Sequence, residues 1–182
     1  MIKAFLVKSR ILVPNIEDSK YLYSNGFYGK PVGISKPKSV NDITRPLELS
    51  LIEGVYLAKK GIIEVHNKNN EVLDYEKLYD YSAKVINKFN IIYSVYEDLR
   101  NRGFIVRSGI KYGADFAVYT LGPGLEHAPF VVIALDIEEN LTPQELLSFG
   151  RVSHSTRKRL VLGLVDSRNN TIRYIMFKWL KI

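Results

Sequence analysis

Cysteine is absent from this sequence of 182 residues, and histidine occurs only three times, at His66, His127 and His154. The lack of cysteine excludes disulfide bonds, thiolate catalysis and every zinc site that needs Cys. The three histidines lie far apart in the sequence, so a metal site would have to rest mainly on carboxylates. No run of about 18 apolar residues is present, which excludes a membrane-spanning helix.

Several catalytic sequence motifs are also missing. The strained G-x-S-x-G elbow of serine hydrolases does not occur, and neither do the phosphate-binding patterns G-x-x-x-x-G-K-[ST] and G-x-G-x-x-G. A metal-dependent nuclease on a small mixed sheet needs clustered carboxylates, and its usual Glu-x-Lys pair is absent. What remains is metal-free acid–base chemistry, and we expect no cofactor.

The positive charge of the chain is concentrated in one segment of its second half. The sequence has 26 Lys and Arg against 19 Asp and Glu, a net charge of +7. Residues 146–165 contain Arg151, Arg157, Lys158 and Arg159 and no acid. Such a cluster suits a polyanion such as nucleic acid. It is also typical of a helix C-terminus, where cations complement the helix dipole, and charge alone favours this second interpretation.

The first residues are not a secretory signal. Lys3, Lys8 and Arg10 interrupt the apolar segment at the start of the chain, where a signal peptide would need an unbroken apolar core. We therefore expect a cytoplasmic protein with no membrane partner.

Patterning predicts an α/β (α+β) protein with two parts, residues 1–87 and 88–182. The first part reads as a small mixed α/β domain. Its expected elements are strands within 2–13, an extended loop over 30–46, a helix over 47–61, a strand at 62–67 and a helix following Asp74.

The second part reads as a nuclease-like domain, a central mixed β-sheet flanked by helices. Thr142 and Glu145 form a capping box with Pro143 at the first helical position, which predicts a helix to about His154. The other expected elements are a helix over 91–103 and strands over 104–109, 111–120, 127–137, 159–166 and 171–182.

RNA permits metal-free cleavage because its 2′-hydroxyl is an internal nucleophile. The reaction needs a base for that hydroxyl, an acid for the departing 5′-oxygen and positive charge at the phosphorus. Tyr119, His127 and Lys158 offer these three functions. A phenol has a pKa of about 10 and is a weak base near neutral pH, unless neighbouring cations such as the Lys/Arg cluster favour the phenolate. Taken singly, each residue is also explained by packing or by ordinary solvent exposure.

Three ordered motifs of the sequence resemble the archaeal tRNA-splicing endonuclease family. They are LRNRGFIVRSGIKYGADFAVY, the isolated His127, and RVSHSTRKRLVLGLVD. The segments GFYGK and LELSLIEGVYLAKKGIIEV are similar to the N-terminal domain of that family. The resemblance implies a metal-independent endoribonuclease that cuts a bulge-helix-bulge in precursor tRNA and leaves 2′,3′-cyclic phosphate and 5′-hydroxyl ends.

The resemblance also implies the roles of single residues. Tyr119 corresponds to the general base, His127 to the general acid, and Lys158 to the group that stabilises the pentacovalent transition state. Arg151, and more weakly Arg173, correspond to a pair of arginines that hold a bulge base between them. Three residues of the same types lie close to these positions but do not match the family motif. Tyr112 is expected to be structural, His154 to lie at a helix end, and Arg157 to contact the RNA backbone.

The turn between the last two strands departs from the family pattern. Members that assemble from one kind of chain carry an acid-rich turn there, which docks into a basic groove of a neighbouring subunit. Here Asp166 is the only acid within residues 166–170, and Arg168 adds a positive charge. We therefore expect self-association together with a second, structural subunit in an α2β2 tetramer. Subunits are expected to pair through the final strand, with Ile175, Phe177, Trp179 and Ile182 alternating along it as the pairing surface, unless that surface closes the core of a single chain.

Two alternatives remain from the sequence. One is a noncatalytic RNA-binding structural subunit of the same complex, although such subunits tend to lose members of the triad and this chain has all three. The other is a metal-dependent DNA nuclease or junction resolvase, which the absent Glu-x-Lys disfavours.

Overall fold

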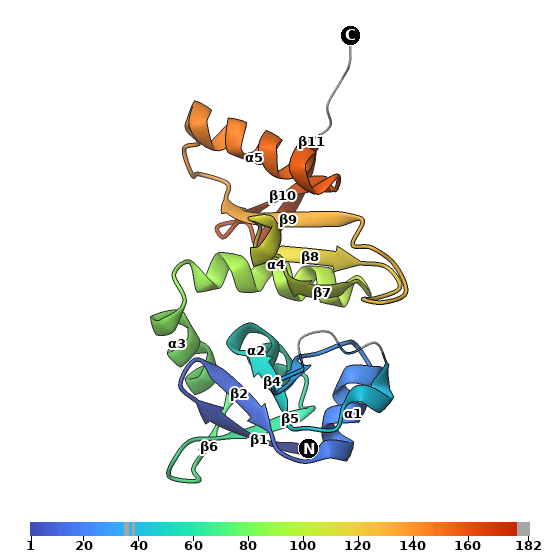
Figure 1. Cartoon of the computed structure of the whole chain (residues 1–182). Helices are drawn as coiled ribbons and strands as arrows, with labels where there is room; N and C mark the ends of the chain where they lie inside the picture. The colour runs from blue at the N-terminus through green and yellow to red at the C-terminus, as the bar shows by residue number, and fades with distance from the viewer. Residues whose placement is uncertain (35–36, 38, 178–182) are drawn as a thin grey trace. The chain divides into compact units, whose positions relative to one another are not determined.

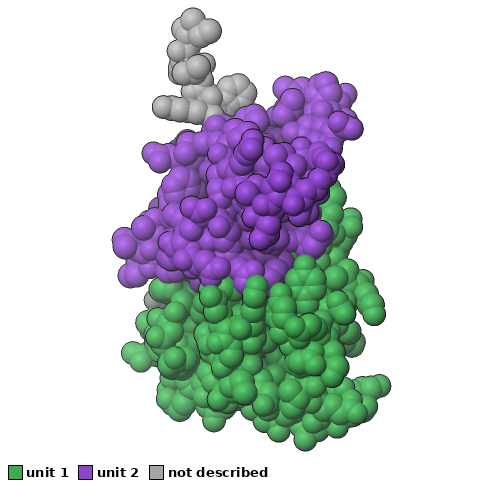
Figure 2. All heavy atoms as spheres, turned by 180° about the vertical axis from the view of Figure 1, so that it is seen from behind, with its two compact units in different colours: residues 1–89 green, residues 90–182 purple. Residues whose placement is uncertain are grey.

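The computed structural model describes residues 1–34, 37 and 39–177, and the chain divides into two compact units (Figures 1 and 2). The N-terminal unit is residues 1–89 and the C-terminal unit is residues 90–182. Each combines a mixed β-sheet with α-helices, so the predicted α+β class is confirmed.

The N-terminal unit is built on a mixed sheet with strand order β3-β4-β2-β1-β5-β6. Its elements in chain order are β1 (Ile2–Val7), β2 (Arg10–Val13), α1 (Ile16–Ser24), β3 (Lys30–Pro31), the 3-10 helix η1 (Val40–Asp42), β4 (Leu47–Ser50), α2 (Leu51–Lys59), β5 (Ile63–His66), β6 (Val72–Leu73) and α3 (Tyr75–Val85). Strands β1 and β5 are parallel, and the other strand pairs are antiparallel. The fully buried core side chains come from both strands and helices, and include Ile11, Val13, Leu47, Leu49, Val55, Leu57 and Val65.

The single helix predicted over residues 47–61 is wrong at its start, because residues 47–50 form strand β4. Ser50 ends the strand and caps α2: its hydroxyl accepts from the Glu53 N–H, and the Glu53 carboxylate accepts from the Ser50 N–H. Leu47 and Leu49 are both fully buried with an intervening half-buried residue, which is strand alternation. The helical spacing of the leucines concealed this change of structure.

Helix α1 was not predicted. Its N-cap is Asn15, whose side chain accepts a hydrogen bond from the Asp18 N–H at 3.0 Å, and Glu17 and Asp18 lie in its first turn. The helix predicted after Asp74 is confirmed as α3, with the Asp74 carboxylate accepting from the Lys77 N–H at 2.9 Å.

The C-terminal unit is a mixed sheet with strand order β11-β10-β9-β8-β7. Its elements in chain order are α4 (Phe89–Asn101), which begins at the unit boundary, β7 (Ile105–Ser108), the 3-10 helix η2 (Ile110–Tyr112), β8 (Phe116–Tyr119), β9 (Phe130–Asp136), α5 (Pro143–Thr156), β10 (Arg159–Asp166) and β11 (Thr171–Phe177). Strands β9 and β10 are parallel, whereas the remaining pairs are antiparallel.

Helices α4 and α5 cover opposite faces of this sheet (Figure 1). On one face Phe149 of α5 packs in a buried cluster with Val131 and Leu160, which are register partners on neighbouring strands. On the other face a Cβ added to Gly163 would lie 3.0 Å from a methyl group of Val95 in α4, so the helix approaches the strand closely there. The sheet flanked by helices was predicted, as was the Thr142 capping box of α5.

The strand predicted over residues 111–120 begins only at Phe116. Residues 110–112 form η2 instead, and Gly113 follows in the left-handed region at φ 74°. Left-handed backbone suits glycine because it has no Cβ. The short helix turns the chain back before β8, and this places Tyr112 beside the strand rather than in it.

Strand β11 is an edge of the sheet. Ile175 is 48% exposed and Met176 is 50% exposed, while Phe177 packs edge-on against Phe149 with ring centroids 6.4 Å apart. Phe177 therefore belongs partly to the core of its own chain, whereas Ile175 is available on the surface. Trp179 and Ile182, which were predicted to belong to the same pairing surface, lie outside the described residues.

Helices of the described part of the chain fall short of the length and apolar character needed to cross a bilayer.

Candidate active site

Lys158 lies between the end of α5 and the start of β10. Helix α5 stops at Arg157, which adopts left-handed backbone at φ 53°, and the chain then enters the strand. The Lys158 ammonium donates a hydrogen bond to the Ala128 carbonyl at 2.9 Å and lies 5.0 Å from the centre of the Tyr112 ring. Its charge is therefore held at a corner formed by Tyr112 and Ala128, which we call the Tyr112–Ala128 corner.

Tyr119 reaches the same corner from the end of β8. Its side chain packs in a buried cluster with Ala128, and Tyr112 borders that cluster. Tyr119 is 8% exposed, so its phenol is largely shielded from solvent. Tyr119 and Lys158 thus share two neighbours although they are far apart in the sequence.

His127 adjoins the corner through the backbone. It immediately precedes Ala128 in the loop of residues 120–129 that joins β8 to β9, and its side chain is exposed. The exposed imidazole is open to a substrate from solvent. The structure therefore brings Tyr119 and Lys158 to one corner of the C-terminal unit, and the backbone of His127 adjoins that corner at Ala128.

Burial is the main influence on the phenol of Tyr119, and it raises the pKa of Tyr119 above 10.0. The neighbouring Tyr112 and Glu126 raise this pKa further, because both disfavour a second negative charge nearby. Lys111 and Arg107 act in the opposite direction and lower the pKa by attracting the phenolate. At neutral pH the phenol form dominates.

Two cations that favour the Tyr119 phenolate lie outside the Lys/Arg cluster near residue 158, from which the sequence-based hypothesis drew them. They are Lys111 and Arg107. Arg107 pairs with Ala117 across β7 and β8, two residues from Tyr119 and on the same face of the sheet. Strand pairing, which the sequence alone does not specify, brings it there.

Tyr112 has more contacts with the site than its predicted structural role implied. Its ring borders both buried clusters of the α5 face, and the Lys111 ammonium lies 4.6 Å from the ring centre. The interaction with the Tyr112 side chain also raises the pKa of Lys111. With Lys158 at 5.0 Å, two ammonium groups approach the same aromatic ring.

The three predicted RNA-binding arginines all have exposed side chains. Arg151 is in α5 and Arg157 is at the C-terminal end of that helix. Arg173 is on β11 opposite Leu164, which packs against the cluster beneath α5, so Arg173 extends from the face of the sheet that α5 covers. His154 is in the last turn of α5 and its carbonyl accepts from the Arg157 N–H at 3.3 Å.

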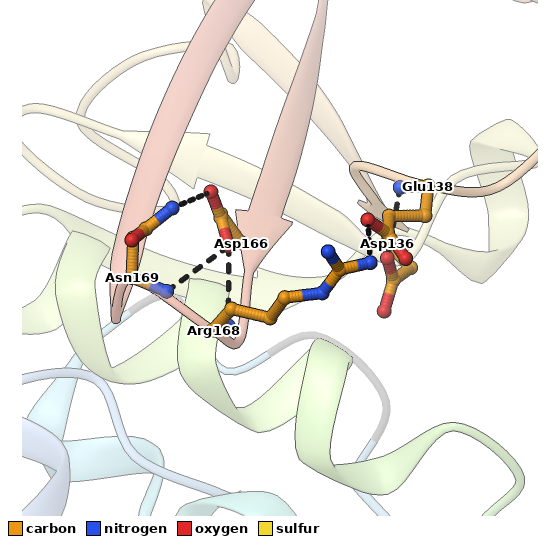
Figure 3. A network of polar contacts seen from close by, with 5 residues as sticks. All are labelled: Asp136, Glu138, Asp166, Arg168 and Asn169. Carbon is orange, nitrogen blue, oxygen red and sulfur yellow. Dashed lines mark hydrogen bonds and ion pairs between the residues drawn. The ribbon is translucent and has the colours of Figure 1, made fainter.

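The charged side chains of the β10–β11 turn form hydrogen bonds and an ion pair with neighbouring residues (Figure 3). The Asp166 carboxylate accepts hydrogen bonds from the Arg168 N–H at 3.1 Å and from the Asn169 side-chain amide at 2.8 Å. These bonds, led by those from Asn169, lower the pKa of Asp166. Arg168 extends from the turn and forms an ion pair with Glu138. The carboxylate of the turn is thus directed into its own backbone.

A polar pocket of about 330 Å³ lies on the opposite face of the sheet from Tyr119, between α4 and the β10–β11 turn. Asp98 lines it and accepts a hydrogen bond from the Tyr174 hydroxyl at 2.6 Å. The catalytic candidates do not line this pocket. Among the described residues, no group of three or more His, Asp or Glu side chains is arranged to hold a metal ion.

Two family models match the chain in the order of its two units. The tRNA intron endonuclease N-terminal domain matches residues 2–79, and the tRNA intron endonuclease catalytic C-terminal domain matches residues 89–174. The chain belongs to the tRNA intron endonuclease family. All six predicted site residues lie within the match to the catalytic domain of that family.

Relatives from three archaeal species, each named tRNA-splicing endonuclease, extend the similarity over essentially the whole chain. A protein from Saccharolobus islandicus is 74% identical over 182 residues, covering 100% of both chains. One from Saccharolobus solfataricus is 73% identical with the same coverage. One from Sulfurisphaera tokodaii is 62% identical over 177 residues, which is 97% of this chain and 98% of that protein. The resemblance inferred from the sequence motifs is therefore confirmed.

Proposed function

We propose that this chain is the catalytic subunit of a metal-independent endoribonuclease that removes introns from precursor tRNA. It cuts both strands of a bulge-helix-bulge and leaves 2′,3′-cyclic phosphate and 5′-hydroxyl ends. Membership of the tRNA intron endonuclease family supports the substrate class. The observation that carries the proposal is the Tyr112–Ala128 corner, where Tyr119 and Lys158 share neighbours and the exposed His127 precedes Ala128 in the chain.

In the proposed reaction the three side chains act on one phosphodiester. Tyr119 accepts the proton of the ribose 2′-hydroxyl while the 2′-oxygen forms a bond to phosphorus. Lys158 offsets the charge of the pentacovalent transition state. His127 donates a proton to the 5′-oxygen as the bond between phosphorus and that oxygen breaks. Proton exchange with water then restores both side chains.

The buried phenol makes proton acceptance the demanding step. An ordinary phenol is only about one part in a thousand ionised near neutral pH, and burial of Tyr119 raises its pKa above the ordinary value. Lys111 and Arg107 counteract this effect because their charges favour the phenolate. The rate of cleavage is therefore expected to rise with pH only while His127 still holds the proton that it donates, and to level off above that pH.

The remaining sequence-based assignments complete the proposal. Arg151 and Arg173 hold a splayed bulge base between their guanidinium planes, and Arg157 contacts the RNA backbone. Residues 88–182 carry out catalysis, while residues 1–87 support assembly of the complex. The enzyme works in the cytoplasm.

Assembly requires a second subunit in this proposal. The Asp166 carboxylate bonds within its own turn, and Arg168 adds a positive charge paired with Glu138. Such a turn is poorly suited to a basic groove, so a structural subunit with an acidic turn provides the docking element of an α2β2 tetramer. The exposed Ile175 on edge strand β11 suits pairing between subunits.

The catalytic assignment is tested with His127→Ala in a cleavage assay on bulge-helix-bulge RNA. We expect a decrease in rate of about 10²–10⁴, the usual effect of removing an acid–base group. His154→Ala, which removes another exposed imidazole of the same unit, is the matched control and should cleave normally. EDTA should leave the wild-type rate unchanged. A wild-type rate in His127→Ala removes His127 from the mechanism, and loss of activity in EDTA contradicts metal independence.

The subunit requirement is tested by measuring mass by light scattering and cleavage for the purified chain, with and without a candidate partner that has an acidic turn. We expect full activity only in the mixed tetramer. Full activity of the chain alone would contradict the need for a second subunit.

A further inference from the structure

The loop between β8 and β9 is closed by the side chain of Glu126. One of its carboxylate oxygens accepts hydrogen bonds from the Thr120 N–H at 2.5 Å and from the Leu121 N–H at 2.6 Å. Its own N–H donates to the Gly122 carbonyl at 3.2 Å. Thr120 is the first residue after Tyr119, and Glu126 is the last residue before His127. The carboxylate thus links the backbone next to the proposed base to the backbone next to the proposed acid.

Backbone contacts also shape the loop: the Leu125 N–H donates to the Gly122 carbonyl at 3.2 Å, and Pro123 and Glu126 form an isolated bridge. Gly122 and Gly124 have φ of 124° and 89°, conformations that glycine adopts at low cost, and glycine is also the most flexible residue. Leu121 is 60% exposed and Leu125 is 71% exposed, so these apolar side chains do not anchor the loop in a core. Hydrogen bonds to an ionised carboxylate are short and about twice as strong as those between neutral groups. The Glu126 carboxylate is therefore the main side-chain restraint on the loop, in addition to these backbone contacts.

A second restraint acts on the other side of His127. Ala128 is 3% exposed, and its carbonyl accepts the hydrogen bond from the Lys158 ammonium at 2.9 Å. His127 consequently lies between two fixed neighbours. One is tied to the end of the strand that carries Tyr119, and the other is tied to Lys158.

We propose that Glu126 is a positioning residue that holds His127 in place to protonate the leaving group, an inference that rests on the function proposed above. Because an acid displaced by about 1 Å loses about 10²-fold in rate, a loop restraint of this kind has a large effect on catalysis. Glu126 does not act as the proton donor. Backbone hydrogen bonds, first from Leu121 and then from Thr120 and Gly122, lower the pKa of Glu126 and keep it ionised near neutral pH.

Glu126 has the opposite effect on the proposed base. Its negative charge raises the pKa of Tyr119, so removing that charge favours the phenolate. Tyr112 raises the same pKa, and Lys111 and Arg107 lower it. A Glu126 variant is therefore expected to lose rate through the acid while its base ionises slightly more easily, and the two effects are separable by the choice of leaving group.

The experiment compares two bulge-helix-bulge RNAs in single-turnover cleavage by the full chain, in the assembled complex. One has the natural 5′-oxygen at the scissile bond, and the other has sulfur there, a leaving group that needs no protonation. The variants are Glu126→Ala, His127→Ala and Tyr119→Phe. Glu76→Gln removes one exposed carboxylate from the N-terminal unit and is the control for net charge.

On the oxygen substrate we expect Glu126→Ala to cleave about 10- to 100-fold more slowly than wild type, with unchanged affinity for RNA. On the sulfur substrate Glu126→Ala and His127→Ala should both approach the wild-type rate, whereas Tyr119→Phe should not. Glu126→Gln keeps one acceptor oxygen, so its loss should be smaller than that of Glu126→Ala. Should Glu126→Ala fail to fold, the same comparison is made with Glu126→Gln.

Two results overturn the inference and leave the proposed function standing. One is a wild-type rate for Glu126→Ala on the oxygen substrate. The other is a defect in Glu126→Ala that persists on the sulfur substrate while His127→Ala recovers. If His127→Ala itself fails to recover with sulfur, the general acid of the proposed function is wrong, and the role of Glu126 fails with it.

Discussion

Replacement of Lys158 by methionine separates the charge of this side chain from its packing. Methionine retains an unbranched apolar chain of similar length but has no ammonium group. The ammonium of Lys158 contacts the Ala128 carbonyl at 2.9 Å and the Tyr112 ring at 5.0 Å. The variant therefore loses one hydrogen bond from a charged donor and one cation–π contact, and it loses the positive charge proposed to face the phosphate.

The substitution affects stability and catalysis by different amounts. A hydrogen bond from a charged group contributes about 1.5–3 kcal/mol, and a cation–π contact at a partly exposed site contributes about 0.5–1 kcal/mol. Because such values are not additive, we expect the free energy of unfolding to fall by about 2–3 kcal/mol. Removal of one group that stabilises transition-state charge should lower kcat by about 10²–10³.

Thermal or denaturant unfolding measures the change in stability. Single-turnover cleavage of bulge-helix-bulge RNA measures the change in rate, at a temperature where the variant is folded. Lys158→Arg retains the charge and should recover part of the rate. Lys84→Met, at an exposed position in α3, should change neither quantity. A folded Lys158→Met that cleaves within about threefold of wild type would refute the proposed role of the ammonium.

Three further predictions concern other charged and phenolic groups. Lys111→Met removes a charge that lowers the pKa of Tyr119, so less phenolate forms and cleavage at pH 7 should slow; a pH–rate profile measures this. Tyr174→Phe loses the 2.6 Å bond to Asp98, at a cost of about 1.5–3 kcal/mol in unfolding experiments. Burial, and then this bond, raise the pKa of Tyr174 in the folded protein above 10.0, its ordinary value. The stability that the neutral phenol contributes is therefore fully present below pH 10 and is lost as the pH rises through the pKa of the folded state. Tyr174→Phe has no phenol to ionise, so it should lose less stability than wild type in strong alkali. Arg151→Gln should weaken RNA binding and reduce the salt slope by about one, and unchanged affinity and slope would argue against a contact with RNA.

Two helices with a capping residue at their start were predicted well from the sequence. Thr142 and Asp74 cap α5 and α3 through the hydrogen bonds that their residue types indicate. Strand β4 was missed because Leu47 and Leu51 have helical spacing, although Ser50 carries the signal for a helix that starts one residue later. Asn15 is the corresponding capping signal for α1.

The candidate site was only partly predictable for a different reason. Motif resemblance identified Tyr119, His127 and Lys158, because the residue types and their order are visible in one dimension. The contribution of Arg107 depends on strand pairing, and that of Lys111 depends on the 3-10 helix that replaced the first part of the predicted strand. Neither pairing register nor the point at which a strand starts is specified by apolar periodicity alone.

The chemistry of the new RNA ends tests the central claim most directly. The assembled enzyme is incubated with bulge-helix-bulge RNA in EDTA, and the ends of the products are analysed. Attack by the neighbouring ribose oxygen, assisted by Tyr119, His127 and Lys158, predicts 2′,3′-cyclic phosphate and 5′-hydroxyl ends at both cut sites. Products with 3′-hydroxyl and 5′-phosphate ends would show that water attacked the phosphorus, and that result would contradict the mechanism.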